Sequence, residues 1–297
     1  MPAAARVALA TCAALPQLTE DDRLLQDELR RAGAEAAAAV WDDRGVDWSR
    51  FDRVVVRSCW DYHLRLPEFL AWVDAVEKLG VTLWNPGRLL RANAHKSYLR
   101  ELAARGFPLV PTAWLSRGSR AGLAALLDER GWTDVVVKPA VSASAFRTWR
   151  VARAEAEGAA ARRAFADLIE AGDLLVQRFA PEVLWPGEWS FVFLGERYSH
   201  AVLKRPAAGD FRVQHEFGGQ IADEAPSPAL RAQAQRVADW IPRPWLYARI
   251  DVVEIAGTLH VMEVELIEPA LFLGSDPAAP RRFAEAVLSA RPGAVTP

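Results

Sequence analysis

Two acidic residues, Glu263 and Glu265, lie inside an apolar stretch, LHVMEVELIEPA, whose composition predicts a buried strand. Side chains alternate between the faces of a strand, so both carboxylates project to one side, about 7 Å apart. The preceding apolar stretch carries Asp251, and a three-residue loop at 256–258 would place Asp251 opposite Glu263, whereas a two-residue loop would separate them. Carboxylates gathered on one surface demand a cation. Hard oxygen donors without His or Cys suit Mg²⁺.

A second interpretation of these acids stays open. They could pair with Arg249, which shares a face with Asp251 by the same alternation, or they could solvate an exposed face of the sheet. The lysines of the chain favour the metal site. Lys138 ends the apolar run DVVVKPA, where a buried ammonium needs an anion, and Lys96 lies at the start of a predicted helix.

Residues suited to nucleotide binding lie between these lysines and the acids. Lys138 is followed by the small residues VSASAF, with Ser142 among them, and such a run can bring backbone N–H groups close to phosphate oxygens. Gln177 ends an apolar strand, and an amide can read an adenine edge. Glu188 follows eleven residues later, and a carboxylate can accept from ribose hydroxyls. Each of these residue types is common on surfaces, so the indication comes from their combination.

Apolar runs and turn residues predict the elements that position these side chains. Between residues 1 and 92, strands alternate with helices, which is typical of a parallel, Rossmann-like α/β sheet. We expect strands there at 6–11, 34–42, 51–58 and 81–86, and helices at 20–34 and 67–80. The region 93–180 should hold helices at 93–106, 120–131 and 155–171 and strands at 109–115, 134–140, 146–152 and 173–181. The region 181–297 is rich in strands, expected at 188–206 with a turn at 195–196, at 211–219, 245–255 and 258–266, with helices at 227–239 and 280–290.

The composition is that of an ordinary soluble protein. The chain has 297 residues, 51% of them hydrophobic, and a net charge of -2, so no basic field argues for nucleic acid. Only Cys12 and Cys59 are present, which suits a reducing cytoplasm. We expect neither a signal peptide nor a membrane span, because no apolar run is long enough. A Walker loop and a GxGxxG turn are also missing, so the first region does not argue for a dinucleotide.

Together and in this order, the lysines, Gln177, Glu188 and the acids resemble the ATP-grasp superfamily, in the branch with glutathione synthetase, ribosomal S6-type modification ligases and D-alanine–D-alanine ligase. The resemblance implies an α/β fold that becomes α+β in the C-terminal part: a substrate domain at 1–92, a lid subdomain at 93–180 and a catalytic subdomain at 181–297, the last two clasping ATP. It places nucleotide contacts on Lys96, Lys138, Ser142, Gln177, Phe179 and Glu188, with Glu182 as the alternative to Glu188. It places Mg²⁺ on Asp251, Glu263 and Glu265, although the usual pattern has Asn at the position of Glu265.

The chemistry implied by this resemblance is carbon–nitrogen bond formation. ATP phosphorylates a substrate carboxylate, an amine attacks the acyl phosphate, and ADP and phosphate leave. Arg212, Lys204 and Arg205 are the catalytic candidates, because their charges can stabilise anionic oxygens. A phosphotransferase with a stable phosphorylated product and a nucleotide-binding module without turnover are the alternatives.

The substrate is expected at the end of the strand FDRVVVRS, because ligands of open α/β sheets bind outside the carboxyl ends of strands. Arg57, with Ser58, could hold a carboxylate, Asp61 an amino group, and Trp60 could form a flat wall; alternatively Arg57 and Asp61 pair and Trp60 is core. The segments RSCWDY and HKSYLREL resemble the group with the cyclo-ligase of cycloserine biosynthesis. That implies antibiotic biosynthesis and an amino-acid-like substrate that closes a ring within itself. A homodimer stays open.

Overall fold

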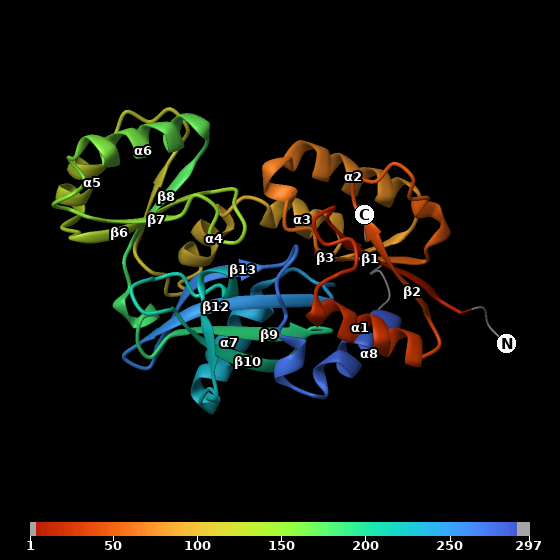
Figure 1. Cartoon of the computed structure of the whole chain (residues 1–297). Coiled ribbons are helices and arrows are strands. Elements are labelled where there is room, and N and C mark those ends of the chain that lie inside the picture. Colours follow the sequence, from red (N-terminus) through yellow and green to blue (C-terminus); the bar gives the residue numbers. More distant parts are fainter. Residues whose placement is uncertain (1–3, 290–297) are drawn as a thin grey trace.

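The computed structural model describes residues 4–289, and three β-sheets organise this part of the chain (Figure 1). The strands of the sheets fall within residues 6–84, 112–178 and 188–265. This mixed architecture confirms the predicted α/β fold with an α+β C-terminal part. The domain boundaries at residues 92 and 180 fall between sheets and stay a prediction. No helix among the described residues has the length and apolarity needed to cross a membrane.

The first sheet is parallel, as the sequence predicts. Its strands are β1 (Arg6–Thr11), β2 (Glu35–Val40), β3 (Arg53–Ser58) and β4 (Thr82–Trp84), in the order β2-β1-β3-β4. Helices α2 (Leu66–Lys78) and α3 (Gly87–Asn93) lie on one face, and α1 (Glu20–Arg31) lies on the other (Figure 1). Helix α1 begins where the Thr19 hydroxyl accepts from the Asp22 N–H, and the acids of its first turn favour the positive end of the helix dipole.

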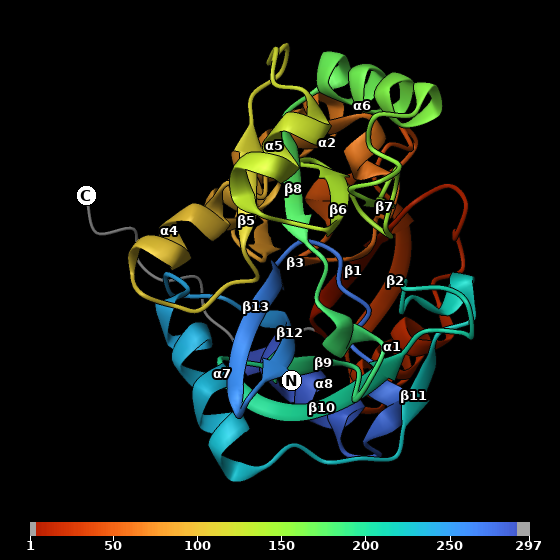
Figure 2. The ribbon, with the colours of Figure 1, turned by 90° about the vertical axis from the view of Figure 1, so that its left-hand side faces the viewer.

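The second sheet is antiparallel and has its own core. Its strands are β5 (Thr112–Leu115), β6 (Asp134–Pro139), β7 (Trp149–Ala152) and β8 (Leu174–Arg178), in the order β5-β8-β6-β7. Helices α5 (Leu123–Arg130) and α6 (Ala159–Ala171) cover one face, where Val135 and Val137 are buried against them (Figure 2). By alternation, Val136 and Lys138 face the opposite side, and this explains a lysine directly after three valines.

The predicted helix at 93–106 is wrong in its first half. Helix α3 ends at Asn93 and α4 starts only at Tyr98 (Tyr98–Ala104). Between them, the Lys96 N–H donates to the carbonyl of Ala140 at 2.9 Å, so the backbone joins the end of β6 instead of continuing a helix. The Asn93 side chain also binds the third sheet, at Val264 and Leu266. Tertiary hydrogen bonds thus override the helical pattern here.

The third sheet is antiparallel and forms the base of the molecule. Its strands are β9 (Glu188–Leu194), β10 (Arg197–Arg205), β11 (Gln220–Ala222), β12 (Tyr247–Ile255) and β13 (Thr258–Glu265), in the order β11-β10-β9-β12-β13. Helix α7 (Pro228–Trp240) packs beneath it, and α8 (Ala279–Ser289) packs beside α1 (Figure 1). The predicted hairpin at 195–196 is confirmed. The predicted strand at 211–219 is wrong, because that segment is a loop with a short 3₁₀ turn at His215–Phe217.

The turn between β12 and β13 is shorter than expected, but Asp251 and Glu263 still lie opposite each other. The loop has two residues, Ala256 and Gly257, both with positive φ, and Ile255 pairs with Thr258. By itself this loop would separate Asp251 from Glu263. A bulge at Met262 shifts the register between Asp251 and Val252, so Asp251 still lies opposite Glu263. The prediction that these acids face each other is therefore confirmed, although the reason given for it is wrong.

The first and third sheets share a core. Leu9 and Leu25 from the first region pack in one cluster with Tyr247 and Phe283 from the C-terminal region. Asn85, which is fully buried, completes this junction: its side chain donates to the carbonyls of Tyr247 and Leu266, both at 2.8 Å, and accepts from the Leu246 N–H at 2.6 Å. The cluster beneath α5 and α6, by contrast, contains only residues 113–176.

Replacing Asn85 should therefore weaken the whole protein. Asn85→Ala leaves buried backbone groups of the C-terminal region unpaired and should lower the free energy of unfolding by about 2–4 kcal/mol, measured by urea denaturation. The exposed Gln17→Ala variant is the control and should change it by less than about 0.5 kcal/mol. Equal stability of the two variants would show that the junction is not held this way.

Candidate active site

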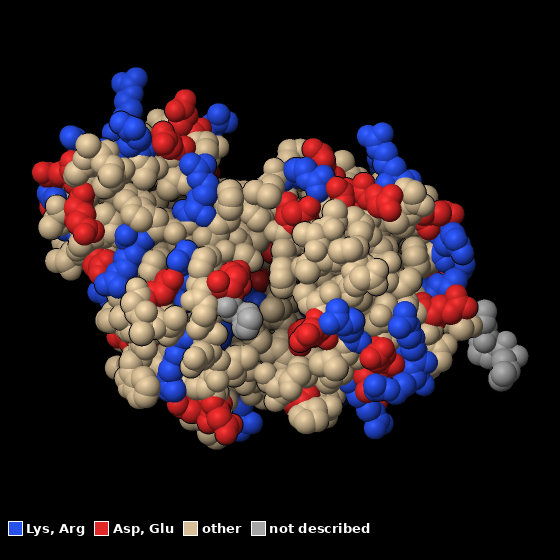
Figure 3. Space-filling model, viewed as in Figure 1, with Lys and Arg blue, Asp and Glu red and all other residues tan. Residues whose placement is uncertain are grey.

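A cavity of about 1060 Å³ lies where the three sheets meet, and the surface is hollowed between the two upper parts of the molecule (Figure 3). Most predicted site residues line it: Arg57, Trp60, Lys96, Lys138, Ser142, Gln177, Phe179, Glu188, Lys204, Arg212, Asp251, Glu263 and Glu265. Ser58, Asp61, Glu182 and Arg205 are not part of its lining. The fold thus gathers residues from 57 to 265 around one space.

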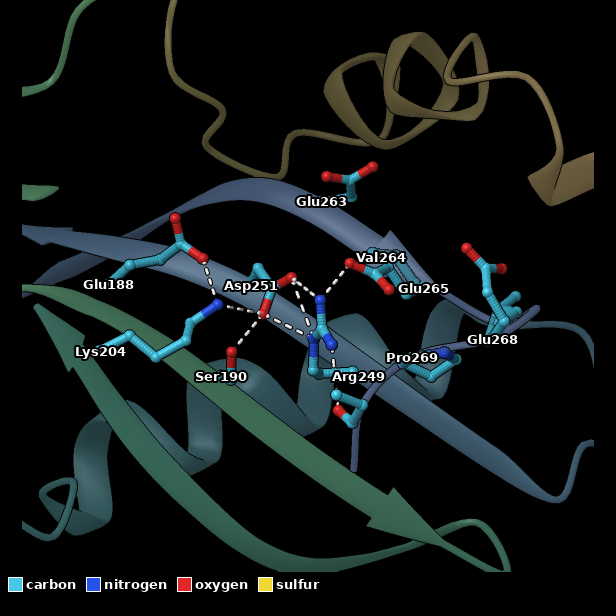
Figure 4. A network of polar contacts seen from close by, with 12 residues as sticks. Glu188, Ser190, Lys204, Arg249, Asp251, Glu263, Val264, Glu265, Glu268 and Pro269 are labelled. Atoms are coloured by element: carbon cyan, nitrogen blue, oxygen red, sulfur yellow. Dashed lines mark hydrogen bonds and ion pairs between the residues drawn. The ribbon is translucent and has the colours of Figure 1, made fainter. Parts of the chain in front are cut away.

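The floor of the cavity is a network of buried charges on β9, β10 and β12 (Figure 4). Lys204 donates to Glu188 at 2.6 Å and lies 3.5 Å from Asp251. Asp251 also accepts from the Ser190 hydroxyl, and it accepts from the Nε–H and Nη2–H groups of Arg249 at 3.0–3.1 Å. Each strand contributes every second residue to this face, which is why the charges meet.

The chain itself supplies the cations that these acids need. Burial alone would raise the pKa of Asp251, but the charges of Arg249 and Lys204 overcome it and hold that pKa below its usual range. Arg249 also donates to Glu265, whose pKa burial nevertheless raises well above normal. Burial likewise raises the pKa of Glu188 despite Lys204. The interpretation that Arg249 pairs with the acids is thus borne out for Asp251 and Glu265.

Lys96 forms a second charged contact, between the second and third sheets. Its ammonium donates to Glu263 at 2.8 Å and to the carbonyl and hydroxyl of Ser142 at 2.7 and 3.1 Å. Lys138 lines the same wall, but its ammonium group takes part in none of the side-chain hydrogen bonds or ion pairs found among residues 4–289. Burial lowers the pKa of Lys138, partly opposed by Glu263. A buried ammonium with this environment is a receptor for an anion.

The other predicted nucleotide contacts lie on the strand β8 and just beyond it. Gln177 is buried and donates to the Thr112 hydroxyl at 3.1 Å, so its carbonyl oxygen is the end left for a ligand. The ring of Phe179 stacks under the Arg150 guanidinium, 3.6 Å from the ring centre. Apolar Met262 from β13 lines the cavity with them. Two apolar side chains and one amide thus line this part of the cavity.

Two of the three catalytic candidates line the cavity, and the third does not. Lys204 lies within the network described above, and Arg212 lines the cavity, where Asp210 pairs with it at 2.7 Å. Arg205 instead donates to the carbonyl of Pro186 at 2.7 Å and pairs with Glu224. Strand alternation places Arg205 on the opposite face from Lys204, because they are adjacent on β10.

Of the four substrate candidates, Arg57 and Trp60 line the cavity, and Ser58 and Asp61 do not. Arg57 is 1% exposed and pairs with Asp22 at 2.8 Å, not with Asp61. Asp61 instead accepts from Arg65 at 2.7 Å and from the Trp41 indole at 2.9 Å. The hydroxyl of Ser58 is buried against Thr11, whereas Trp60 lines the cavity and is 37% exposed.

Sequence reasoning missed Asp21, Asp22 and Glu268, which also line the cavity. The acids at 21 and 22 looked like ordinary first-turn residues of a helix, and only the tertiary fold brings them to Arg57. The signal for Glu268 was available, since an acid in the apolar run LIEPA repeats the anomaly of Glu263 and Glu265.

The oxygen donors of Asp251, Glu263 and Glu265 fit Mg²⁺ in kind, because all three acids line the cavity and no softer ligand stands among them. Among the described residues, no group of three or more His, Cys, Asp or Glu side chains is already arranged around a metal position. The acids bind Arg249, Lys204 and Lys96 instead.

Removing Arg249 should expose how much the acids depend on it. Arg249→Met leaves Asp251 and Glu265 short of a buried partner and should lower the free energy of unfolding by about 3–5 kcal/mol in urea without ligand. Arg281→Met removes an exposed pair with Glu285 and should cost less than about 1 kcal/mol. An Arg249 variant as stable as the Arg281 variant would contradict this.

Comparison with known sequences gives the family. Residues 7–85 match the family described as D-cycloserine synthetase DcsG, N-terminal domain. The cycloserine biosynthesis protein DcsG of Streptomyces lavendulae is 34% identical over 299 residues, covering 95% of this chain and 97% of the relative. Glutathione synthetase of Bordetella pertussis is 25% identical over 226 residues, covering 76% of this chain and 67% of the relative.

Comparison with solved structures agrees. The crystal structure of D-cycloserine synthetase DcsG gives a TM-score of 0.84 at 33% identity, covering 95% of this chain and 98% of that one. A RimK domain ATP-grasp protein from Sphaerobacter thermophilus gives 0.72 at 20% identity, covering 96% and 100%. D-alanine–D-alanine ligase from Bacillus anthracis, complexed with ATP, gives 0.64 at 14% identity, covering 96% of both chains. The last two confirm the ATP-grasp fold, and the DcsG relative shows that the chain belongs to the DcsG family of ATP-grasp ligases.

Proposed function

We propose that the chain uses ATP and Mg²⁺ to activate the carboxylate of a small amino-acid-like substrate as an acyl phosphate, which an amine of the same molecule attacks to close a ring. The observation that carries the proposal is the meeting of Lys96 and Lys138 with Asp251 and Glu263 in one cavity. The two lysines can bind phosphate oxygens, and the two carboxylates can bind a divalent cation. Membership of the DcsG family supports the ring closure.

The nucleotide would lie between the second and third sheets. Phe179 and Met262 offer apolar surface to a base, and the carbonyl of Gln177 can accept from an exocyclic amine. Glu188 lines the cavity one strand away and remains the candidate for the ribose hydroxyls. The phosphates would then reach Lys96, Lys138 and the N–H groups near Ser142.

Phosphoryl transfer would be stabilised by charge. In the first step, a bond forms between a substrate carboxylate oxygen and the γ-phosphorus, and the bond from that phosphorus to the departing ADP oxygen breaks. Lys138 and Lys96 would neutralise the oxygens on which charge gathers, and Arg212, which lines the same cavity, is the candidate to hold the acyl phosphate. Mg²⁺, held by Asp251, Glu263 and Glu265, would supply further charge neutralisation at the phosphates.

Ring closure requires the amine to lose a proton. The amine nitrogen bonds to the carbonyl carbon, the bond from that carbon to the phosphate oxygen breaks, and the proton passes to the departing phosphate or to solvent. No nucleophilic side chain is needed. Cys12 and Cys59 are free and buried, and burial raises the pKa of Cys59, so neither is suited to attack.

The remaining expectations are part of the same proposal. We propose a cytoplasmic enzyme with a substrate domain at 1–92, a lid at 93–180 and a catalytic subdomain at 181–297. A small molecule is its partner, with neither nucleic acid nor a membrane involved. The core cluster of the second sheet supports the assignment of residues 93–180 as a lid. The formation of a homodimer stays an open alternative.

Two substitutions test the chemistry. Lys138→Ala and Asp251→Asn should each lower ADP release by at least about 100-fold, because each removes charge from the transferring phosphoryl group. The assay combines the enzyme, ATP, Mg²⁺ and an amino-acid panel, with hydroxylamine trapping the acyl phosphate as a hydroxamate. The exposed Lys78→Ala variant should behave like the wild type. Near-normal turnover of either site variant, or a stable phosphate ester in place of a hydroxamate, would refute the proposal.

A further inference from the structure

Five consecutive backbone carbonyls after β13 accept hydrogen bonds from side chains, and this segment, residues 266–270, is called the strap. The pairs are Asn85 to Leu266 at 2.8 Å, Tyr247 to Ile267 at 2.8 Å, Trp60 to Glu268 at 3.1 Å, Arg57 to Pro269 at 2.8 Å and Arg249 to Ala270 at 3.0 Å. Donors from the first and third regions of the chain therefore fix every peptide of the strap. A backbone held this closely positions its side chains precisely for a ligand.

Glu268 is the charged side chain of the strap, and it has no partner. It is 8% exposed and lines the cavity, yet no hydrogen bond or ion pair found among residues 4–289 reaches its carboxylate. Figure 4 shows it beyond Glu265, with no dashed line to any of the residues drawn. An isolated buried carboxylate is costly, and burial raises the pKa of Glu268 to about 8. A cationic ligand group beside it would favour the ionised carboxylate and pair with it.

The charges around the strap select the sign of that group. Arg57, which holds the strap, is already paired with Asp22 at 2.8 Å. Asp21 accepts from the N–H of Gly274 at 3.2 Å through one oxygen, while its other oxygen is buried without a partner. Among the described residues, Arg57 Nη1 is also buried without a partner. Lys96 and Arg249 also act on Glu268, but both are already paired with other acids. The carboxyl groups of Asp21 and Glu268, which line the cavity, are thus the ones with which a cationic ligand group could pair.

We propose that Glu268 binds the ammonium group of the amino-acid-like substrate and thereby determines specificity for an amino acid over the corresponding simple acid. This inference rests on the proposed function for the identity of the ligand. Glu268 would hold the substrate at the end of the cavity near the first sheet, and the carboxylate to be activated would point towards Lys96 and Lys138. Arg57, the earlier candidate for the substrate carboxylate, acts instead as a positioning residue that fixes the strap.

The test measures binding without turnover. Isothermal titration calorimetry in ADP and Mg²⁺ would compare cycloserine with isoxazolidin-3-one, the same ring without its amino group. The wild type should prefer cycloserine by about 10- to 100-fold, because a charged hydrogen bond in a buried site contributes that much. Glu268→Gln keeps the shape, removes the charge and should abolish the preference. The exposed Glu129→Gln variant should retain it.

Several results would overturn the inference. A wild type without the preference, including one that binds neither ring, would do so, as would a Glu268→Gln variant that keeps it. A variant that instead raises the Mg²⁺ requirement for ATP binding would mark Glu268 as a metal ligand. Circular dichroism and thermal unfolding guard against misfolding: Tm should stay near that of the wild type, since Gln has the same shape and the substitution breaks no buried ion pair.

The hydroxamate assay separates this inference from the proposed function. Hydroxamate formation by the wild type, together with an unchanged ring preference in Glu268→Gln, would leave the proposed function standing and refute the role of Glu268. If Glu268→Gln loses the ring preference while the wild type forms no hydroxamate from any acid, the role of Glu268 would stand and the proposed function would be refuted.

Discussion

Buried carboxylates that must each find a cation constrain this protein more than any other feature. Asp251, Glu263 and Glu265 come from two neighbouring strands, and in the described structure they are bound by Arg249, Lys204 and Lys96. Removing one partner of such a group is costly, so the charges hold one another in place. The side chains are thereby gathered before any ligand arrives, and ligand binding would exchange partners within this set.

The same charges lie where the second and third sheets meet. The second sheet has a core of its own, but Leu175 and Ala140 also pack in the core cluster of the third sheet. The contact of Lys96 with Glu263 lies at the boundary between them, close to Ser142. A nucleotide would bring phosphates for the lysines and a divalent cation for the acids, so that both halves of the contact exchange partners. Ligand binding and the arrangement of the sheets are thus coupled through one set of charges.

The sequence predicted the fold and much of the cavity, and the failures have physical causes. Apolar runs located the sheets, and period-two alternation placed Glu263 and Glu265 on one face. Asp251 was placed with them by an expected three-residue loop, whereas in the structure a two-residue loop and a bulge bring it there. The alternation could not reveal the bulge at Met262, because a bulge depends on pairing between strands. Asp61 adjoins the site in sequence, but contacts from Trp41 and Arg65 turn it elsewhere. Partners far apart in the chain leave no local pattern.

The most direct test of this account is a crystal structure with a non-hydrolysable ATP analogue and Mg²⁺. The account predicts phosphate oxygens at the ammonium groups of Lys96 and Lys138, and oxygens of Asp251 and Glu263 on the metal. In that complex the 2.8 Å contact between Lys96 and Glu263 should be broken. A nucleotide bound elsewhere, with that contact and the contacts of Arg249 unchanged, would contradict it.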